Sequence, residues 1–127
     1  MLVHLDTSLL VDAFTGTRRS LGAVRSATAR GDDLTFSTVV LYEWLRGPRT
    51  DTEREAVETF FATALLPAFD TEAAQRAAAL YRTVRGARRR QADLAIAACA
   101  LEHGASFWTL NRADFADIPG LALYDNA

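Results

Sequence analysis

Four of the 16 acidic residues in this 127-residue chain lie where an acid calls for an explanation: Asp6, Glu43, Asp93 and Asp114. Asp6 directly follows an apolar run, and Glu43 and Asp93 interrupt stretches of apolar and small residues. A carboxylate in apolar surroundings is costly unless it is paired or bound to a cation. Asp114 reads, on its own, as a loop residue.

Each of the first three acids also has a purely structural explanation. Asp6 can serve as the N-cap of the helix that follows it, although Thr7 and Ser8 can cap that helix instead. Glu43 can pair with Arg46 inside a helix that we expect to be largely buried. Asp93 can be stabilised by the positive end of its own helix.

Considered together, the four acids indicate a metal site. Carboxylates brought close together repel one another, so a cluster requires either raised pKa values or a cation. Oxygen-only ligands suit Mg²⁺ or Mn²⁺, and the two histidines, His4 and His103, have no ligand spacing for zinc. A carboxylate-held Mg²⁺ chiefly serves phosphoryl chemistry, and with no nucleophilic side chain evident the attacking group is water.

The elements that would position these acids alternate between strands and helices. Apolar runs predict five strands, at 2–5, 34–37, 65–69, 106–110 and 121–124. Capping residues and helical periodicity predict helices at 9–14, 20–30, 38–46, about 50–64, 71–84 and 91–103, with a short turn near Asp114. Two overlapping capping-box patterns, Thr50…Glu53 and Thr52…Glu55, open the fourth of these helices.

This alternation predicts an α/β fold, in which a parallel sheet of about five strands has helices on both faces. We expect one domain over residues 1–127. Active sites in such folds gather at the carboxyl ends of the strands. Asp6 follows the first strand, and Asn111 and Asp114 follow the fourth, so the fold would bring them together.

Composition limits the function classes further. Half of the residues are hydrophobic, and the formal net charge is −2, so bulk attraction to nucleic acid is excluded. All 14 basic residues are Arg, whose planar fork suits phosphate. The run Arg88-Arg89-Arg90, together with Arg85, is either a candidate RNA-binding face or, equally, a solvated helix end. No apolar run is long enough for a membrane span and no signal peptide is evident, so we expect a cytoplasmic protein.

Four motifs, in order along nearly the whole chain, resemble those of PIN-domain proteins. The first motif of this chain is LDTSLLVD at 5–12, and the second is VLYEWLRG at 40–47. The third is DLAIAA at 93–98, and the last is TLNRADF at 109–115. The small size of the chain is similar to that of VapC-type toxins of toxin–antitoxin pairs.

The resemblance implies a Mg²⁺-dependent endoribonuclease, in which Mn²⁺ can replace Mg²⁺. It implies that Asp6 and Asp93 are the principal metal ligands and that Glu43 and Asp114 complete the pocket, directly or through water. It also implies that the neighbouring polar residues position the metal shell or the scissile phosphate: Thr7, Ser8, Thr109 and Asn111. The implied partners are a VapB-like antitoxin, an RNA substrate and a second copy of the chain.

Several other functions remain to be weighed. A response-regulator receiver domain and a haloacid-dehalogenase-type phosphatase both need a Lys, and this chain has none. The phosphatase also needs Asp-x-Asp at the first strand, where Ser8 replaces the second acid. Two alternatives stay open: a non-catalytic PIN-like binding module and a nuclease that acts on DNA.

Overall fold

The centre of the molecule is a parallel sheet of three strands in a computed structural model that describes residues 1–126. The strands are β1 (Leu2–Leu5), β2 (Asp33–Thr35) and β3 (Ser106–Trp108), in the spatial order β2-β1-β3. Val3 lies opposite both Leu34 and Ser106, so the three strands end near the same edge. The predicted parallel α/β sheet is confirmed, with three strands rather than about five.

The predicted strand at 65–69 is wrong. This segment uses its backbone groups around the start of the third helix instead: the Pro67 carbonyl accepts a hydrogen bond from the Thr38 amide, at 3.0 Å. The Leu65 carbonyl accepts one from the Thr35 hydroxyl, at 2.7 Å. Because proline has no amide hydrogen, Pro67 cannot donate to a sheet, and the segment remains a connection.

The predicted strand at 121–124 is reduced to a single parallel bridge between Leu123 and Phe107. The Phe107 amide donates to the Ala122 carbonyl at 2.8 Å, and the Tyr124 amide donates to the Phe107 carbonyl at 2.7 Å. The segment therefore runs beside β3 as expected, but pairs too briefly to form a strand.

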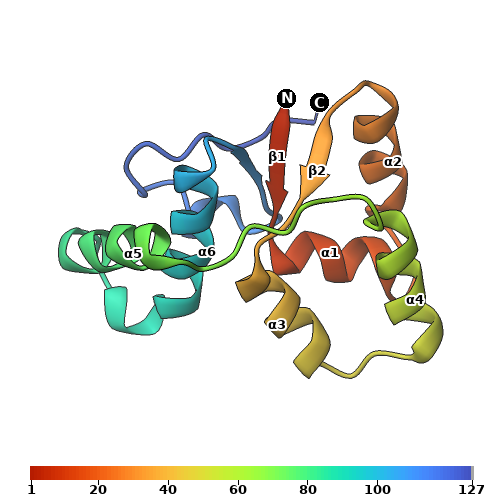
Figure 1. Cartoon of the computed structure of the whole chain (residues 1–127), viewed down its shortest axis with the longest axis horizontal. Helices are drawn as coiled ribbons and strands as arrows, with labels where there is room; N and C mark the ends of the chain where they lie inside the picture. Colours follow the sequence, from red (N-terminus) through yellow and green to blue (C-terminus); the bar gives the residue numbers. More distant parts are fainter. Residues whose placement is uncertain (127) are drawn as a thin grey trace.

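Within residues 1–126, six helices surround the sheet. They are α1 (Thr7–Phe14), α2 (Leu21–Ala29), α3 (Thr38–Arg46), α4 (Asp51–Phe60), α5 (Thr71–Thr83) and α6 (Gln91–Glu102). Two 3₁₀ turns, η1 (Ala87–Arg89) and η2 (Arg112–Asp114), precede α6 and follow β3. In Figure 1, α1, α2 and α4 gather on one side of the molecule and α5 and α6 on the other, with the sheet between them. None of the helices within residues 1–126 is long and apolar enough to cross a membrane.

Local capping sets the starts of several helices. Ser37 caps α3 by accepting from the Val40 amide, and Asp70 caps α5 by accepting from the Ala73 amide. Thr50 and Glu53 form the predicted capping box at the start of α4. The second pattern, Thr52…Glu55, lies inside the helix. The helix also ends at Phe60, four residues before its predicted end.

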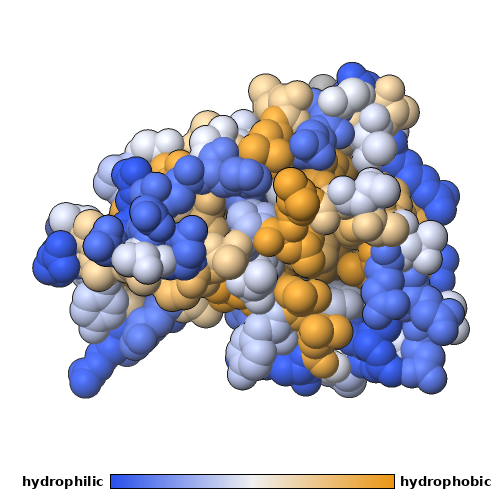
Figure 2. Space-filling model, in the orientation of Figure 1, coloured by the Kyte–Doolittle hydropathy of each residue, from blue (hydrophilic) through white to orange (hydrophobic). Residues whose placement is uncertain are grey.

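Helix α3 is less buried than its sequence indicates. Only Val40 and Trp44 are buried, whereas Tyr42 is 62% exposed and Leu45 is 51% exposed. Figure 2 shows hydrophobic side chains on the outer surface, in a band that runs over α3 and over the connection between α4 and α5. The expectation of a largely buried helix is therefore wrong.

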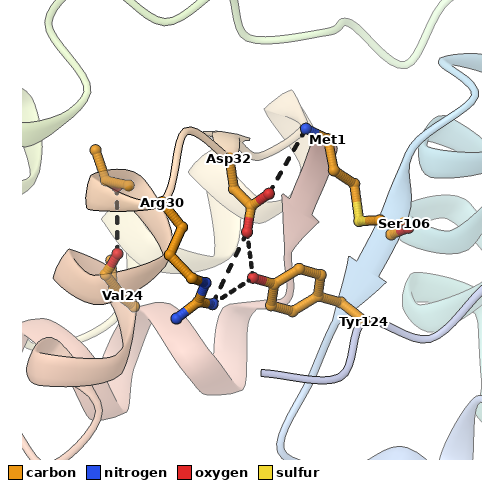
Figure 3. Close-up of polar contacts among 7 residues, drawn as sticks. Met1, Val24, Arg30, Asp32, Ser106 and Tyr124 are labelled. Atoms are coloured by element: carbon orange, nitrogen blue, oxygen red, sulfur yellow. Dashed lines mark hydrogen bonds and ion pairs between the residues drawn. The ribbon is translucent and has the colours of Figure 1, made fainter. Parts of the chain in front are cut away.

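A polar network holds the C-terminal segment against the N-terminal edge of the sheet (Figure 3). The Tyr124 hydroxyl donates to the Asp32 carboxylate and accepts from the Arg30 guanidinium. The N-terminal amine of Met1 lies 3.6 Å from the same carboxylate. These contacts fix the segment that follows η2, at the opposite end of the strands from Asp6.

Candidate active site

Three parallel strands deliver the site residues to one edge of the sheet. Asp6 directly follows β1, and its amide donates to the carbonyl of Trp108 at the end of β3, at 2.9 Å. Thr109 is the next residue along from Trp108. The chain leaves β2 through Ser37 into α3, which carries Glu43 (Figure 1). This is the carboxyl edge where the sequence predicts a site.

Asp6 is buried and fully surrounded by donors. Its side chain accepts from the Thr109 hydroxyl at 2.6 Å, from the Ser8 hydroxyl at 2.9 Å and from the Thr7 amide at 2.9 Å. Burial raises the pKa of Asp6 and outweighs the three hydrogen bonds, which favour the charged form, while the charge of Glu43 raises it further. Asp6 is therefore both the N-cap of α1 and a member of the acidic site.

Glu43 is tied to Asp6 through one intervening residue. The Thr7 hydroxyl donates to Glu43 at 2.5 Å, while the Thr7 amide donates to Asp6. The Arg46 guanidinium lies 3.5 Å from the other Glu43 oxygen, but that Arg side chain is largely exposed. An exposed pair of this kind contributes little stability, so Arg46 neutralises Glu43 only in part.

Asp93 and Asp114 complete the acidic group. Burial is the largest cause that raises the pKa of Asp93, to about 6, and the charges of Asp6, Glu43 and Asp114 follow in that order. Arg90 opposes them. Asp114 is exposed, at the end of η2. The fold therefore brings all four predicted acids close enough to influence one another.

The donor set of this site fits a hard divalent cation. Every candidate ligand is a carboxylate or hydroxyl oxygen, as Mg²⁺ and Mn²⁺ prefer. Within residues 1–126, however, no three Asp, Glu, His or Cys side chains are arranged so that they could hold one ion together. A cation would thus take one or two carboxylates from the protein and its other ligands from water, which is the usual manner of Mg²⁺.

The predicted positioning residues divide into two groups. Ser8 and Thr109 hold Asp6, and Thr7 connects Asp6 with Glu43, so these three act on the carboxylates. Asn111 is exposed, and its side chain makes no capping bond to η2. Its backbone amide donates to the Thr109 hydroxyl at 2.9 Å, which orients that hydroxyl toward Asp6.

The four arginines of the predicted RNA-binding face also differ from one another. Arg85, Arg88 and Arg89 are exposed, on or next to η1 and just before α6. Arg90 is only 18% exposed and is engaged by Asp117. Its guanidinium is therefore already occupied by protein partners.

Two side-chain pairs were missed from the sequence, and only the first of them adjoins the site. Asp117 looks like an ordinary turn residue, yet it binds Arg90 through both carboxylate oxygens, at 2.9 and 2.6 Å. His4 and His103 are 99 residues apart, yet their rings share a hydrogen bond of 2.8 Å. Burial, with the charge of His103, lowers the pKa of His4 to about 4. No local pattern indicates either pair, because each joins distant elements.

Thr109→Val tests how Asp6 is held. The change keeps the shape of the side chain but removes the hydroxyl, so Asp6 loses its shortest hydrogen bond and the Asn111 amide loses its acceptor. We expect the affinity for Mn²⁺, measured by calorimetric titration, to fall about tenfold. Thr109→Ser, which keeps the hydroxyl, is expected to lose much less. Equal affinities in the two variants would contradict this role of the hydroxyl.

The raised pKa of Asp93 predicts a pH-dependent stability of the metal-free protein. Between about pH 4 and pH 6 the folded state holds a proton on Asp93 that the unfolded chain has released, so stability falls as the pH rises through this range. Because Asp93 is only partly buried, we discount the penalty to on the order of 1 kcal/mol. Asp93→Asn should therefore raise the melting temperature at pH 7 and have little effect at pH 4; an equal change at both pH values would contradict the linkage.

Comparison with known proteins agrees with the α/β fold. The PIN domain family model matches residues 3–121. A chain in the crystal structure of VapBC2 from Rickettsia felis, bound to a promoter DNA fragment, is similar over 98% of each chain, with a TM-score of 0.76 and 20% identity. A chain of DNA-bound VapBC from Salmonella typhimurium is similar over 100% of each chain, with a TM-score of 0.75 and 21% identity.

A third similar structure is VapBC-5 from Mycobacterium tuberculosis, a member of the VapBC family of toxin–antitoxin systems. It has a TM-score of 0.62 and 27% identity, and the match covers 95% of this chain and 93% of that one. A search of curated protein sequences gives no match. The family model spans nearly the whole chain. The chain therefore belongs to the PIN-domain family.

Proposed function

We propose that this protein is a Mg²⁺-dependent endoribonuclease and the toxin of a toxin–antitoxin pair. One observation carries the proposal: Thr7 donates to both Asp6 and Glu43 at the carboxyl edge of a PIN-domain sheet, and the charges of Asp6, Glu43 and Asp114 all raise the pKa of Asp93. An acidic pocket of this kind is costly for a fold to maintain without a cation. Its oxygen donors suit Mg²⁺, with Mn²⁺ as a substitute.

In this proposal, Asp6 and Asp93 hold the metal, and Glu43 and Asp114 contact its water ligands. Bound Mg²⁺ supplies an activated water and neutralises charge on the phosphate. Thr109, Ser8 and Thr7 keep the Asp6 carboxylate oriented and charged by donating three hydrogen bonds to it. Exposed Arg85, Arg88 and Arg89 provide positive charge near the site, where they can contact the phosphates of an RNA strand.

The proposed protein partner is a VapB-like antitoxin. All three structures described above are of VapBC proteins, and one is named as a member of a toxin–antitoxin family. Coexpression of this chain with an antitoxin should yield a stable complex that suppresses cleavage. The expected homodimer is a separate prediction, which light scattering on the purified chain measures.

The decisive experiment is incubation of purified, antitoxin-free protein with total cellular RNA in Mg²⁺, in Mn²⁺ and in excess chelator. Discrete fragments that require the metal support the ribonuclease. Parallel reactions with single- and double-stranded DNA separate the two kinds of nuclease. Folded protein that binds RNA or an antitoxin but cleaves neither RNA nor DNA under any metal would favour the binding module.

A further inference from the structure

Arg90 lies between three segments of the chain and bonds to each of them. It is the residue just before α6, and its guanidinium donates to the carbonyl of Arg85 near the end of α5, at 2.9 Å. It donates to the carbonyl of Asp114 at the end of η2, at 2.8 Å. It also binds both carboxylate oxygens of Asp117, three residues beyond Asp114.

We propose that Arg90 and Asp117 form a clamp that positions Asp114 and the start of α6 for metal binding. This inference rests on the proposed function. Arg90 fixes the backbone of Asp114 directly, and Asp93 lies three residues after Arg90, in the first turn of α6. The clamp therefore connects the two acids that come from the C-terminal half of the chain, and Arg90 and Asp117 act as positioning residues.

The geometry requires an arginine. A guanidinium offers several donors in one rigid plane, so it can bind a carboxylate through two bonds and still donate to two carbonyls. A lysine ammonium has the same charge but donates from a single point. The substitution Arg90→Lys therefore keeps the positive charge but removes the planar fork of donors.

The positive charge of Arg90 interacts with the nearby carboxylates. Asp117, Asp93 and Asp114 all stabilise the charged guanidinium. A positive charge this close to a cation site would oppose metal binding if it were free. Asp117 neutralises it, so the clamp can order the site at a reduced electrostatic cost.

The contacts of Arg90 differ from those of an ordinary surface ion pair. Arg76 of α5 and Glu102 at the far end of α6 make a single contact of 2.8 Å, and no carbonyl accepts from Arg76 in the part of the chain that the structure describes. Isolated exposed pairs of that kind contribute little. Arg90 is 18% exposed, compared with 46% for Arg76. Arg76→Gln is thus a matched control that removes an ion pair of α6 away from the site.

The test measures Mn²⁺ binding by calorimetric titration of folded, RNA-free protein in the wild type, Arg90→Lys, Asp117→Asn and Arg76→Gln. Loss of groups that orient metal ligands typically weakens metal binding by 10- to 100-fold. We expect about a tenfold loss in Arg90→Lys and in Asp117→Asn, and no change in Arg76→Gln. Circular dichroism and thermal melts confirm that each variant is folded at the titration temperature.

A second readout needs no metal. In metal-free protein, hydrogen exchange over residues 111–118 should accelerate about tenfold in both clamp variants, because η2 loses its charged anchor. The same peptide should be unchanged in Arg76→Gln. A merely structural salt bridge would lower the melting temperature without selectively affecting this segment or the metal affinity of the folded protein.

The outcomes separate the clamp from the proposed function. If both clamp variants bind Mn²⁺ with wild-type affinity and hydrogen exchange over 111–118 is unchanged, the clamp proposal is refuted but the proposed function is not. Absence of Mn²⁺ binding by the wild type would overturn the proposed metal site. If Arg90→Lys weakens RNA binding but leaves Mn²⁺ binding intact, Arg90 contacts RNA phosphate instead, and the clamp is again wrong.

Discussion

Asp93→Asn is expected to lower the rate of RNA cleavage by about a hundredfold or more, because a catalytic metal contributes several kcal/mol of charge stabilisation. The amide keeps the size of the carboxylate but removes the charge that attracts the cation. The measurement is the initial cleavage rate of a defined RNA fragment at saturating Mg²⁺, using antitoxin-free protein. Asp6→Asn should behave in the same way.

The control for this prediction is Glu102→Gln, an acid-to-amide change at the other end of α6. Glu102 pairs with Arg76 and lies outside the acidic site, so its loss should leave the rate near the wild-type value. The Asp93→Asn protein should be folded and, when metal-free at pH 7, more stable than the wild type. Full activity in a folded Asp93→Asn protein would refute the assignment of the site.

Phe107→Ala is expected to lower the free energy of unfolding by about 3–5 kcal/mol. Phe107 is completely buried in β3, and its ring lies 4.6 Å from that of Phe115, the residue after Asp114. The substitution removes a large part of the packing between the sheet and the segment that carries Asp114. Because domains are stable by only about 5–15 kcal/mol, much of the protein could be unfolded at physiological temperature. Urea denaturation followed by tryptophan fluorescence measures the loss.

Tyr42→Ala is the matched control for the loss of an aromatic ring. Tyr42 is 62% exposed on α3, where the Arg46 guanidinium lies 5.2 Å from its ring centre. A change at such a position is expected to stay within about 0.5 kcal/mol. A loss below about 1 kcal/mol in Phe107→Ala would show that the core around η2 rearranges to fill the cavity.

The helices follow closely from the sequence because their signals are local. Ser37, Thr50 and Asp70 each accept a hydrogen bond from an amide in the first turn of the helix they precede. These residues lie within three positions of their partners, so the sequence contains the whole interaction. The starts of α3, α4 and α5 were therefore predictable to within a residue.

Strands are harder to predict because pairing depends on a distant partner. The run at 65–69 is as apolar as a strand, but the structure uses its carbonyls to bind Thr35 and Thr38. The run at 121–124 lies against Phe107 yet forms one bridge only. Hydrophobicity indicates that a segment lies near the core. Whether the segment forms a strand depends on how many backbone hydrogen bonds a neighbouring strand offers it.

Three of the candidate acids stood out against their local sequence, whereas Asp114 was included because it follows the fourth predicted strand and lies in the last of four motifs in family order. The pairing of Arg90 with Asp117 could not be predicted, because no local signal joins the two residues. In the sequence, Arg90 is the end of a basic run and Asp117 is a polar turn residue, and both readings are locally sensible. Their ion pair joins residues 27 positions apart, across two different elements.

By itself, the sequence determined the alternation of helices and strands and the starts of α3, α4 and α5, and it singled out the four candidate acids. These depend on capping, periodicity and motif order, which act over a few residues. The tertiary structure decided that the sheet has three strands, that α3 is half exposed, that the Thr109 hydroxyl binds Asp6, and that Arg90 binds Asp117. Each of these is a contact between segments far apart in the chain, and its energy depends on burial and on partners that only the folded molecule brings together.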